Sequence, residues 1–142
     1  MLWDDPSSMT ASAPPAIADE LYRRLANSHS PYSGVQVACA IETPDGRIHW
    51  GVNVENAAYP QGLCAEASAI STAVTEGDRA IARVYVASSL PGHIWPCGGC
   101  RQKIWEFSEA GCEIVSVDEH GGAERHPIEA LLPLGFRLPA QR

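Results

Sequence analysis

Four residues in two short segments have the types and spacing needed for metal-assisted chemistry. Cys64 and Glu66 are two positions apart, and Cys97 and Cys100 form a Cys-x-x-Cys pair further along the chain. Thiolates are preferred zinc ligands, and a zinc with three protein ligands keeps its fourth tetrahedral position for water, as catalytic sites do. A carboxylate near that water can move protons during hydrolysis of a C–N bond. The pattern therefore predicts a catalytic zinc site with Glu66 as its proton carrier.

A structural zinc site is the alternative that spacing alone leaves open. His93 lies four residues before Cys97, and either His93 or Cys112 could complete a four-ligand site. Only a catalytic site needs Glu66, because a structural zinc has no use for a proton carrier. Cys39 and Cys112 lie in apolar, strand-like runs, so we expect both to be buried as small hydrophobic residues.

Both thiol segments are predicted to lie at helix starts. Apolar residues three and four apart predict a helix over 64–76 and a second helix that begins near Cys97. The unpaired N–H groups of a helix N-terminus favour thiolate over thiol. Residues two apart on a helix point away from each other, so Cys64 and Glu66 can share a site only if Cys64 lies in the first turn or just before it.

The rest of the chain alternates between helices and strands. Periodicity predicts an amphipathic helix over 17–27, and alternation of apolar residues predicts a hairpin around Pro44-Asp45-Gly46. The predicted strands are 35–41, 48–54, 82–88 and 113–117, followed by a polar segment over 118–125 and a short helix over 127–132. This order predicts an α/β fold whose mixed sheet is covered by helices on both faces.

Asn53 and Glu55 are two apart at the end of the second hairpin strand. Their side chains should therefore point to the same face, opposite to Val52 and Val54. Neighbouring amide and carboxylate groups can bind hydroxyl groups, so the pair is a candidate site for a polyol.

Composition limits the domain count and the partners. The chain has 142 residues, of which 45% are hydrophobic and 19% charged, which suits one globular domain. We expect a mobile leader over 1–15 and a single catalytic domain over 16–142. The net charge of −7 and the scattered Lys and Arg residues argue against a nucleic-acid polymer as partner. A nucleoside or free base is the better candidate.

The cysteines and the N-terminus indicate a cytoplasmic location. Five cysteines, with two in a Cys-x-x-Cys, fit metal binding in a reducing cytosol better than a disulfide framework. The first residues are acidic where a secretory signal has basic ones. No apolar run approaches the about 18 residues of a membrane span.

Several motifs together resemble the small, homotetrameric cytidine deaminases. They are Pro31-Tyr32-Ser33, Asn53-Val54-Glu55-Asn56-Ala57-Ala58-Tyr59-Pro60, Cys64-Ala65-Glu66, Pro96-Cys97-Gly98-Gly99-Cys100-Arg101-Gln102 and Leu131-Leu132-Pro133. The resemblance covers about residues 17 to 136 and includes the three-cysteine form of the zinc nucleobase deaminase signature. It implies a three-layer α/β/α sandwich with a mixed sheet of about five strands, a homotetramer, and one Zn²⁺ per subunit on Cys64, Cys97 and Cys100.

The resemblance also implies a reaction and roles for the site residues. Cytidine and 2′-deoxycytidine are deaminated to uridine and 2′-deoxyuridine, with release of ammonia, in pyrimidine salvage. Zinc activates water for attack at C4 of the pyrimidine, while Glu66 protonates N3 and carries a proton to the departing ammonia. Asn53 and Glu55 hold the ribose 3′-hydroxyl, and the backbone at Ala65 and Pro96 helps to hold the base and the leaving amine.

Two positions depart from the family pattern. Ala67 stands where members often carry an Arg that hydrogen-bonds the zinc thiolates. Three thiolates and Zn²⁺ sum to about −1, so the zinc should be a weaker Lewis acid unless another group compensates, and Arg101 is the nearest candidate in sequence. Val35 stands where many members place a Phe against the substrate, so the pocket should be wider. Tyr59 is expected near the pocket, and Phe136 resembles an aromatic residue that members extend into a neighbouring subunit's site.

Two other functions stay open on the sequence. One is an aminohydrolase for a modified cytosine nucleoside such as blasticidin S, which a wider pocket at Val35 would suit, although Asn53 and Glu55 favour an ordinary ribose. The other is a non-catalytic zinc-stabilised binding module, against which the presence of Glu66 argues.

Overall fold

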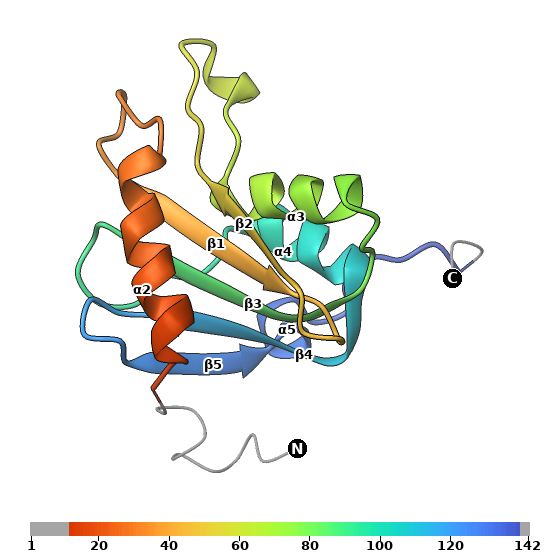
Figure 1. Ribbon diagram of the computed structural model, residues 1–142. Helices are drawn as coiled ribbons and strands as arrows, with labels where there is room; N and C mark the ends of the chain where they lie inside the picture. The colour runs from red at the N-terminus through yellow and green to blue at the C-terminus, as the bar shows by residue number, and fades with distance from the viewer. Residues whose placement is uncertain (1–11, 140–142) are drawn as a thin grey trace.

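A five-stranded sheet forms the centre of the molecule in the computed structural model, which describes residues 12–139 (Figure 1). The strand order is β2-β1-β3-β4-β5. β3 and β4 pair in parallel, and the other three neighbouring pairs are antiparallel, so the sheet is mixed as predicted. The strands are β1 (Val37–Glu42), β2 (Ile48–Val52), β3 (Ile81–Ser88), β4 (Ser108–Val117) and β5 (Ala123–Pro127).

Helices cover both faces of this sheet, which confirms the predicted three-layer α/β/α sandwich (Figure 1). One face packs against α2 (Pro15–Arg24), which continues into the 3-10 turn η1 (Leu25–Asn27). The opposite face packs against α3 (Ala65–Thr75), α4 (Gly98–Phe107) and the short α5 (Ile128–Leu131). A second 3-10 turn, η2 (Tyr59–Gln61), lies in the loop before α3. No helix within residues 12–139 is both long and apolar enough to cross a membrane.

Gly51 allows α3 to lie directly on β2. A Cβ at this position would be 2.3 Å from the backbone nitrogen of Ala69 and 2.6 Å from the carbonyl oxygen of Ala65. Any side chain at position 51 would therefore push the helix away from the sheet. Because Ala65 is the first residue of α3, this contact also fixes where Cys64 and Glu66 lie.

Two expectations about the ends of the domain need correction. The mobile leader was expected to extend to residue 15, but Ala13 is buried, its N–H donates to the Gly121 carbonyl at 3.1 Å, and α2 already begins at Pro15. Proline is favoured in the first helical turn because its fixed φ suits a helix and its missing N–H would have no partner there. Residues 1–11 of the expected leader lie outside the described residues.

β5 was expected to be part of a polar segment. It pairs only with β4 and so forms an edge of the sheet, where charged side chains and proline are tolerated because one side of the strand needs no partner. Its sequence Ala-Glu-Arg-His-Pro lacks the apolar alternation that reveals an inner strand. The fold class with five strands is nevertheless the one predicted.

Candidate active site

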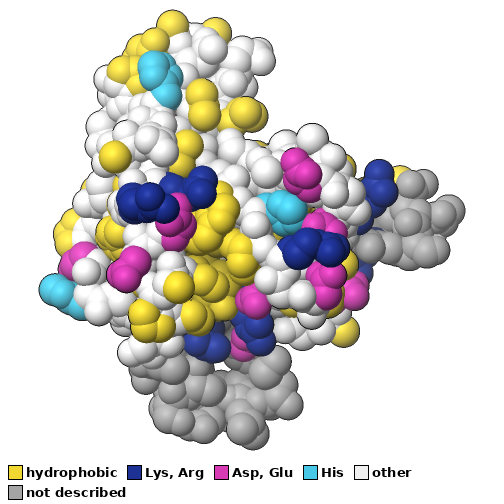
Figure 2. All heavy atoms as spheres, viewed as in Figure 1, with side chains coloured by type: hydrophobic (Ala, Val, Ile, Leu, Met, Phe, Trp, Pro, Cys, Tyr) yellow, Lys and Arg dark blue, Asp and Glu magenta, His cyan; other side chains and the backbone are white. Residues whose placement is uncertain are grey.

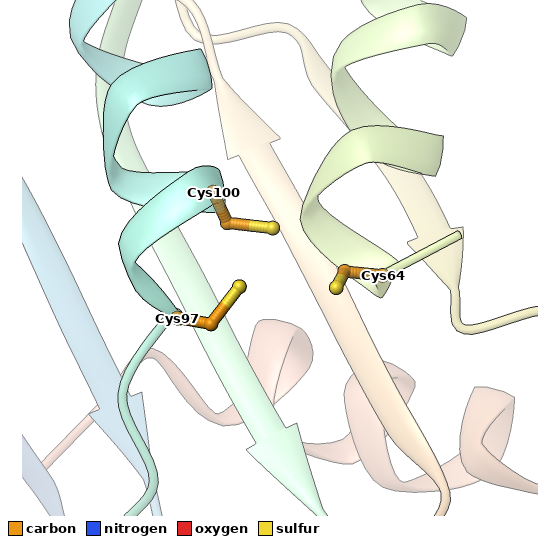
Figure 3. A group of neighbouring side chains, drawn as sticks. All are labelled: Cys64, Cys97 and Cys100. Atoms are coloured by element: carbon orange, nitrogen blue, oxygen red, sulfur yellow. The ribbon is translucent and has the colours of Figure 1, made fainter. Parts of the chain in front are cut away.

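Three cysteine side chains meet between the N-terminal ends of α3 and α4 (Figure 3). Cys64 is the residue immediately before α3, Cys97 is the residue immediately before α4, and Cys100 lies in the first turn of α4. Their sulfur atoms lie within 4.8 Å of one another. Segments that are distant in the sequence are brought together because both helices pack side by side on the same face of the sheet.

The spacing of these sulfurs fits one zinc ion. Zn–S bonds of about 2.3 Å in a tetrahedron place the sulfurs about 3.8 Å apart, which lies within the observed limit. Neither alternative fourth ligand joins the cluster. Cys112 is fully buried in β4, and Nδ1 of His93 lies 3.1 Å from Oγ of Ser116. Among the described residues the cluster therefore has three protein ligands, as a catalytic zinc site requires.

Glu66 lies in the first turn of α3 and is only 4% exposed. Cys64 has extended backbone angles, φ −73° and ψ 156°, so it lies before the helix and can share a site with Glu66. This satisfies the geometric condition set by their spacing. Burial raises the pKa of Glu66, and the ammonium of Lys103 partly opposes that rise. The carboxyl group is therefore placed to hold and release protons beside the thiols.

The thiols differ in how readily they ionise. The backbone N–H of Cys100 stabilises the Cys97 thiolate and lowers its pKa, as predicted for a helix start. Burial raises the pKa of the Cys64 and Cys100 thiols, so for Cys64 the helix start is outweighed by lost solvation. Metal binding at this cluster must therefore release protons.

A cavity of about 380 Å³ opens beside the thiols. This volume lies within the range of small-molecule sites. Its lining brings together most of the predicted site residues, together with five that were not predicted. The predicted ones are Asn53, Glu55, Tyr59, Cys64, Ala65, Glu66 and Cys97, and the additional ones are Val37, Gly62, Leu63, Ile94 and Trp95.

Asn53 ties two segments of the cavity wall together. Its Oδ1 accepts a hydrogen bond from the Val37 backbone N–H at 2.8 Å, and its Nδ2 donates to the Val35 carbonyl at 2.9 Å. Oδ1 also accepts from the Ser28 hydroxyl. Strand β2 ends at Val52, so Asn53 lies just beyond the strand rather than inside it.

Glu55 organises the loop around residues 31–33. Its Oε1 accepts from the backbone N–H groups of Tyr32 at 2.9 Å and Ser33 at 3.1 Å, and its Oε2 accepts from the Ser33 hydroxyl. The hydrogen bonds from Ser33 lower the pKa of Glu55. Glu55 also lines an adjoining hollow of about 390 Å³ together with Tyr59, so this end of the cavity continues outward.

The comparisons with known proteins agree with this geometry. The family model described as the cytidine and deoxycytidylate deaminase zinc-binding region matches residues 18–116. The chain belongs to this deaminase family. It is 35% identical over 122 residues to the cytidine deaminase of Mycoplasma genitalium, covering 85% of this chain and 93% of the relative.

Solved structures of the same deaminase family share the fold. The cytidine deaminase of Burkholderia pseudomallei superposes with a TM-score of 0.78 at 32% identity, covering 87% of this chain and 99% of the other. The cytidine deaminase of Mycobacterium leprae gives 0.71 at 35% identity, covering 82% and 93%. The three-cysteine cluster thus occurs on the fold of zinc-dependent deaminases.

Besides Cys100 of the thiol cluster, three predicted deaminase site residues lie outside the cavity lining. Val35 is half-buried, and its carbonyl is held by Asn53, while Val37 lines the cavity instead. Pro96 is buried between two lining residues, and its carbonyl accepts from Nε of Arg101 at 2.7 Å. Phe136 is 66% exposed. Its backbone is held by the Gln102 side chain through two hydrogen bonds.

Arg101 does not supply the cation that the deaminase pattern lacks at Ala67. Its guanidinium donates to the Pro96 carbonyl and, at 3.0 Å, to the Leu131 carbonyl. Lys103 is a second candidate, since its ammonium lowers the pKa of Glu66 and a Cβ on Gly99 would lie 3.7 Å from its Nζ. Lys103 and Ala67 also line one groove between α4 and α3. Side chains on helices lean toward the N-terminus, which brings Lys103 back over the turn that carries Cys100.

The apolar lining was not predicted as part of the site. Ile94 and Trp95 lie in the loop before α4 and pack partly against the core. Only their position directly before Pro96 and Cys97 could have indicated this, because apolar residues near a motif are more often part of the core. Leu63, immediately before Cys64, was missed for the same reason.

Proposed function

We propose that this chain catalyses the hydrolytic deamination of cytidine and 2′-deoxycytidine to uridine and 2′-deoxyuridine, with release of ammonia. One observation carries the proposal: a cavity of about 380 Å³ is lined by Asn53, Glu55, the buried Glu66 and two thiols of the three-cysteine cluster. The cytidine deaminases named above share 32 to 35% of their aligned residues with this chain, and the two with solved structures share its fold.

The chemistry is assigned to the thiol cluster and Glu66. Cys64, Cys97 and Cys100 would hold the zinc, which when bound supplies a Lewis acid that lowers the pKa of water to about 7. Glu66 accepts a proton from the attacking water and delivers it to N3 of the pyrimidine. It then takes the second proton of that water from the new C4 hydroxyl group and delivers it to the leaving amine. The C4–N bond breaks, a C4–O bond forms, and one water is consumed for each ammonia released.

Positioning is assigned to the cavity wall. The Glu55 carboxylate accepts a hydrogen bond from a ribose hydroxyl, and Asn53 offers its amide to the same sugar. Both groups already carry hydrogen bonds that hold them in place, so little rotamer freedom is lost on binding. The backbone N–H of Ala65 at the start of α3 and the carbonyl of Pro96 are assigned to the base and the leaving amine. Tyr59 borders the sugar end of the cavity.

The assembly is proposed to be a homotetramer. Apolar side chains gather on the surface beside α2 (Figure 2), where Ile48, Trp50 and Val52 of β2 are only partly covered. Phe136 is exposed and anchored only through its backbone, so it can enter the site of a neighbouring subunit. Sedimentation equilibrium should then give four times the 15.2 kDa of one chain. All five cysteines are free, which supports a reducing, cytoplasmic location.

The deciding experiment follows the loss of cytidine absorbance by purified protein whose zinc content is measured in parallel. We expect turnover with one zinc per chain, loss of turnover when a chelator removes the metal, and recovery when zinc is returned. A protein that carries one zinc per chain and converts no cytidine would overturn the proposal.

The competing substrate is tested in the same assay. An aminohydrolase for blasticidin S would give a kcat/KM for the antibiotic well above that for cytidine. We expect the opposite order, because Asn53 and Glu55 line the cavity as they would for an ordinary ribose.

A further inference from the structure

Trp95 is one of two aromatic residues that line the cavity, and in the sequence it lies two residues before the thiol of Cys97. It lies in the loop between β3 and α4 and lines the cavity together with Glu66 and Ala65. Val37 and Ile94 are the other apolar residues that line the cavity and pack partly on the core. Apolar residues, Trp95 among them, therefore line the cavity together with its polar groups.

The Trp95 indole packs against the imidazole ring of His126. Its ring centroid lies 5.0 Å from that of His126 in β5, with the two planes inclined at 59°. It also packs against the core cluster beneath α3 and α4. His126 does not line the cavity, whereas Trp95 does, so Trp95 lies between His126 and the other lining residues in the sense that it contacts both groups. An aromatic side chain held in this way loses little conformational entropy when a ligand binds.

A nucleoside has the matching distribution of groups. Its sugar needs polar partners, its amine-bearing carbon must reach the thiol cluster, and the flat base between them needs an apolar wall. Val35 lies outside the cavity lining, and the aromatic residues within the lining are Tyr59 and Trp95. Tyr59 also lines the outer hollow with Glu55, which leaves Trp95 as the aromatic residue beside the thiols.

We propose that the Trp95 indole is the wall against which the pyrimidine ring packs, so that Trp95 sets how tightly this chain binds its substrate. The inference rests on the proposed function and extends it to a residue outside the zinc motif. Because the contact exists in both the bound substrate and the transition state, its loss changes KM much more than kcat.

The test compares two replacements of Trp95. Trp95→Leu keeps an apolar side chain but removes the ring, and we expect KM for cytidine to rise by about 10- to 100-fold, since stacking of a base on an aromatic ring is typically of that strength. We expect kcat to change by less than about threefold. Trp95→Phe keeps a ring and should restore most of the affinity. Zinc content and the urea midpoint of each variant serve as controls for folding.

The contact between the rings of Trp95 and His126 allows a second variant with a smaller expected effect. His126→Leu leaves Trp95 in place and removes the ring behind it, so we expect KM to rise by only a few fold, again with kcat nearly unchanged. A merely structural role of Trp95 would instead lower zinc content and kcat together in Trp95→Leu.

Binding without turnover gives an independent measurement. Uridine, the product, should quench the tryptophan fluorescence of the wild type, and Trp95→Phe should lack most of that quenching. Equal quenching in both proteins, or a wild-type KM in zinc-loaded Trp95→Leu, would overturn the inference. Failure of the proposed function has a different signature, namely a zinc-loaded wild type that converts no cytidine.

Discussion

The two walls of the cavity are built in different ways. The wall with the thiols consists of two helix N-termini seated on the core, where Glu66 and Cys100 are almost fully buried and Gly51 holds α3 against the sheet. The wall with Asn53 and Glu55 consists of loops that are joined by hydrogen bonds. Some run from side chains to backbone groups, and others run between backbone groups, such as those between Val54 and Leu63. One wall is fixed by packing and the other by hydrogen bonds.

The difference between the two walls suits different tasks, bond making at the packed helices and substrate selection at the loops. Packed helices hold catalytic groups within narrow limits, which bond making requires. Hydrogen-bonded loops can be changed without rebuilding the core, which suits groups that select a substrate. Variants in the thiol wall should therefore change kcat or zinc binding, whereas variants in the loop wall should change KM.

Glu66→Gln should produce the largest effect. The amide keeps the shape of the buried side chain but cannot transfer protons, so we expect kcat to fall by about 10²- to 10⁴-fold. Zinc content and the urea midpoint should stay close to those of the wild type. Stopped-time ultraviolet assays together with metal analysis measure both, and a kcat within threefold of the wild type would contradict the proton-carrier role.

Glu55→Gln should act mainly on KM. Loss of the charge weakens the hydrogen bonds to the sugar and to Tyr32 and Ser33, so we expect kcat/KM for cytidine to fall by about 10-fold or more. With 3′-deoxycytidine, the variant and the wild type should differ much less. Glu76→Gln, which removes the same charge at the far end of α3, is the matched control. An equal loss on both substrates would argue against the sugar contact.

Lys103→Gln should produce a smaller effect on the thiol wall. Lys103 is exposed, so its charge is partly screened, and we expect a chelator to remove zinc about two- to fivefold faster from the variant. Ala67→Arg in the same background should slow zinc loss again, and in the wild type it should alter the pH dependence of kcat. Equal rates of zinc loss in Lys103→Gln and the wild type would mean that another group balances the thiolates.

Asp78→Asn lies outside both walls and should leave kcat and KM unchanged. Hydrogen bonds from Arg47, including one at 3.0 Å, and contact with His49 at 2.6 Å lower the pKa of Asp78 to about 2. A carboxyl whose pKa is lowered by folding stabilises the protein above its unfolded value of about 4, and this contribution disappears as the pH falls toward 2. Urea unfolding should show a less stable variant at pH 7 and a shrinking difference from the wild type below pH 4. A constant difference would exclude this linkage.

The sequence predicted helices and strands best where apolar residues recur at a regular spacing. The hairpin, α2 and the helices that follow Cys64 and Cys97 were predicted from apolar spacing, with boundaries within a few residues. β5 was missed because an edge strand can be polar. Trp95 was missed because nothing in its own sequence neighbourhood distinguishes an aromatic residue that lines a cavity from one that packs in the core.

By itself, the sequence predicted the thiol ligands and the proton carrier, because thiol and carboxylate chemistry depends on residue type and on spacing along one helix turn. It could not determine that His93 and Cys112 stay away from the thiols, that Arg101 is used by backbone carbonyls, or that Trp95 borders the cavity. Those facts depend on how α3, α4 and the intervening loops pack on the sheet. Contacts between segments far apart in the chain are set by packing, and only the tertiary structure contains them.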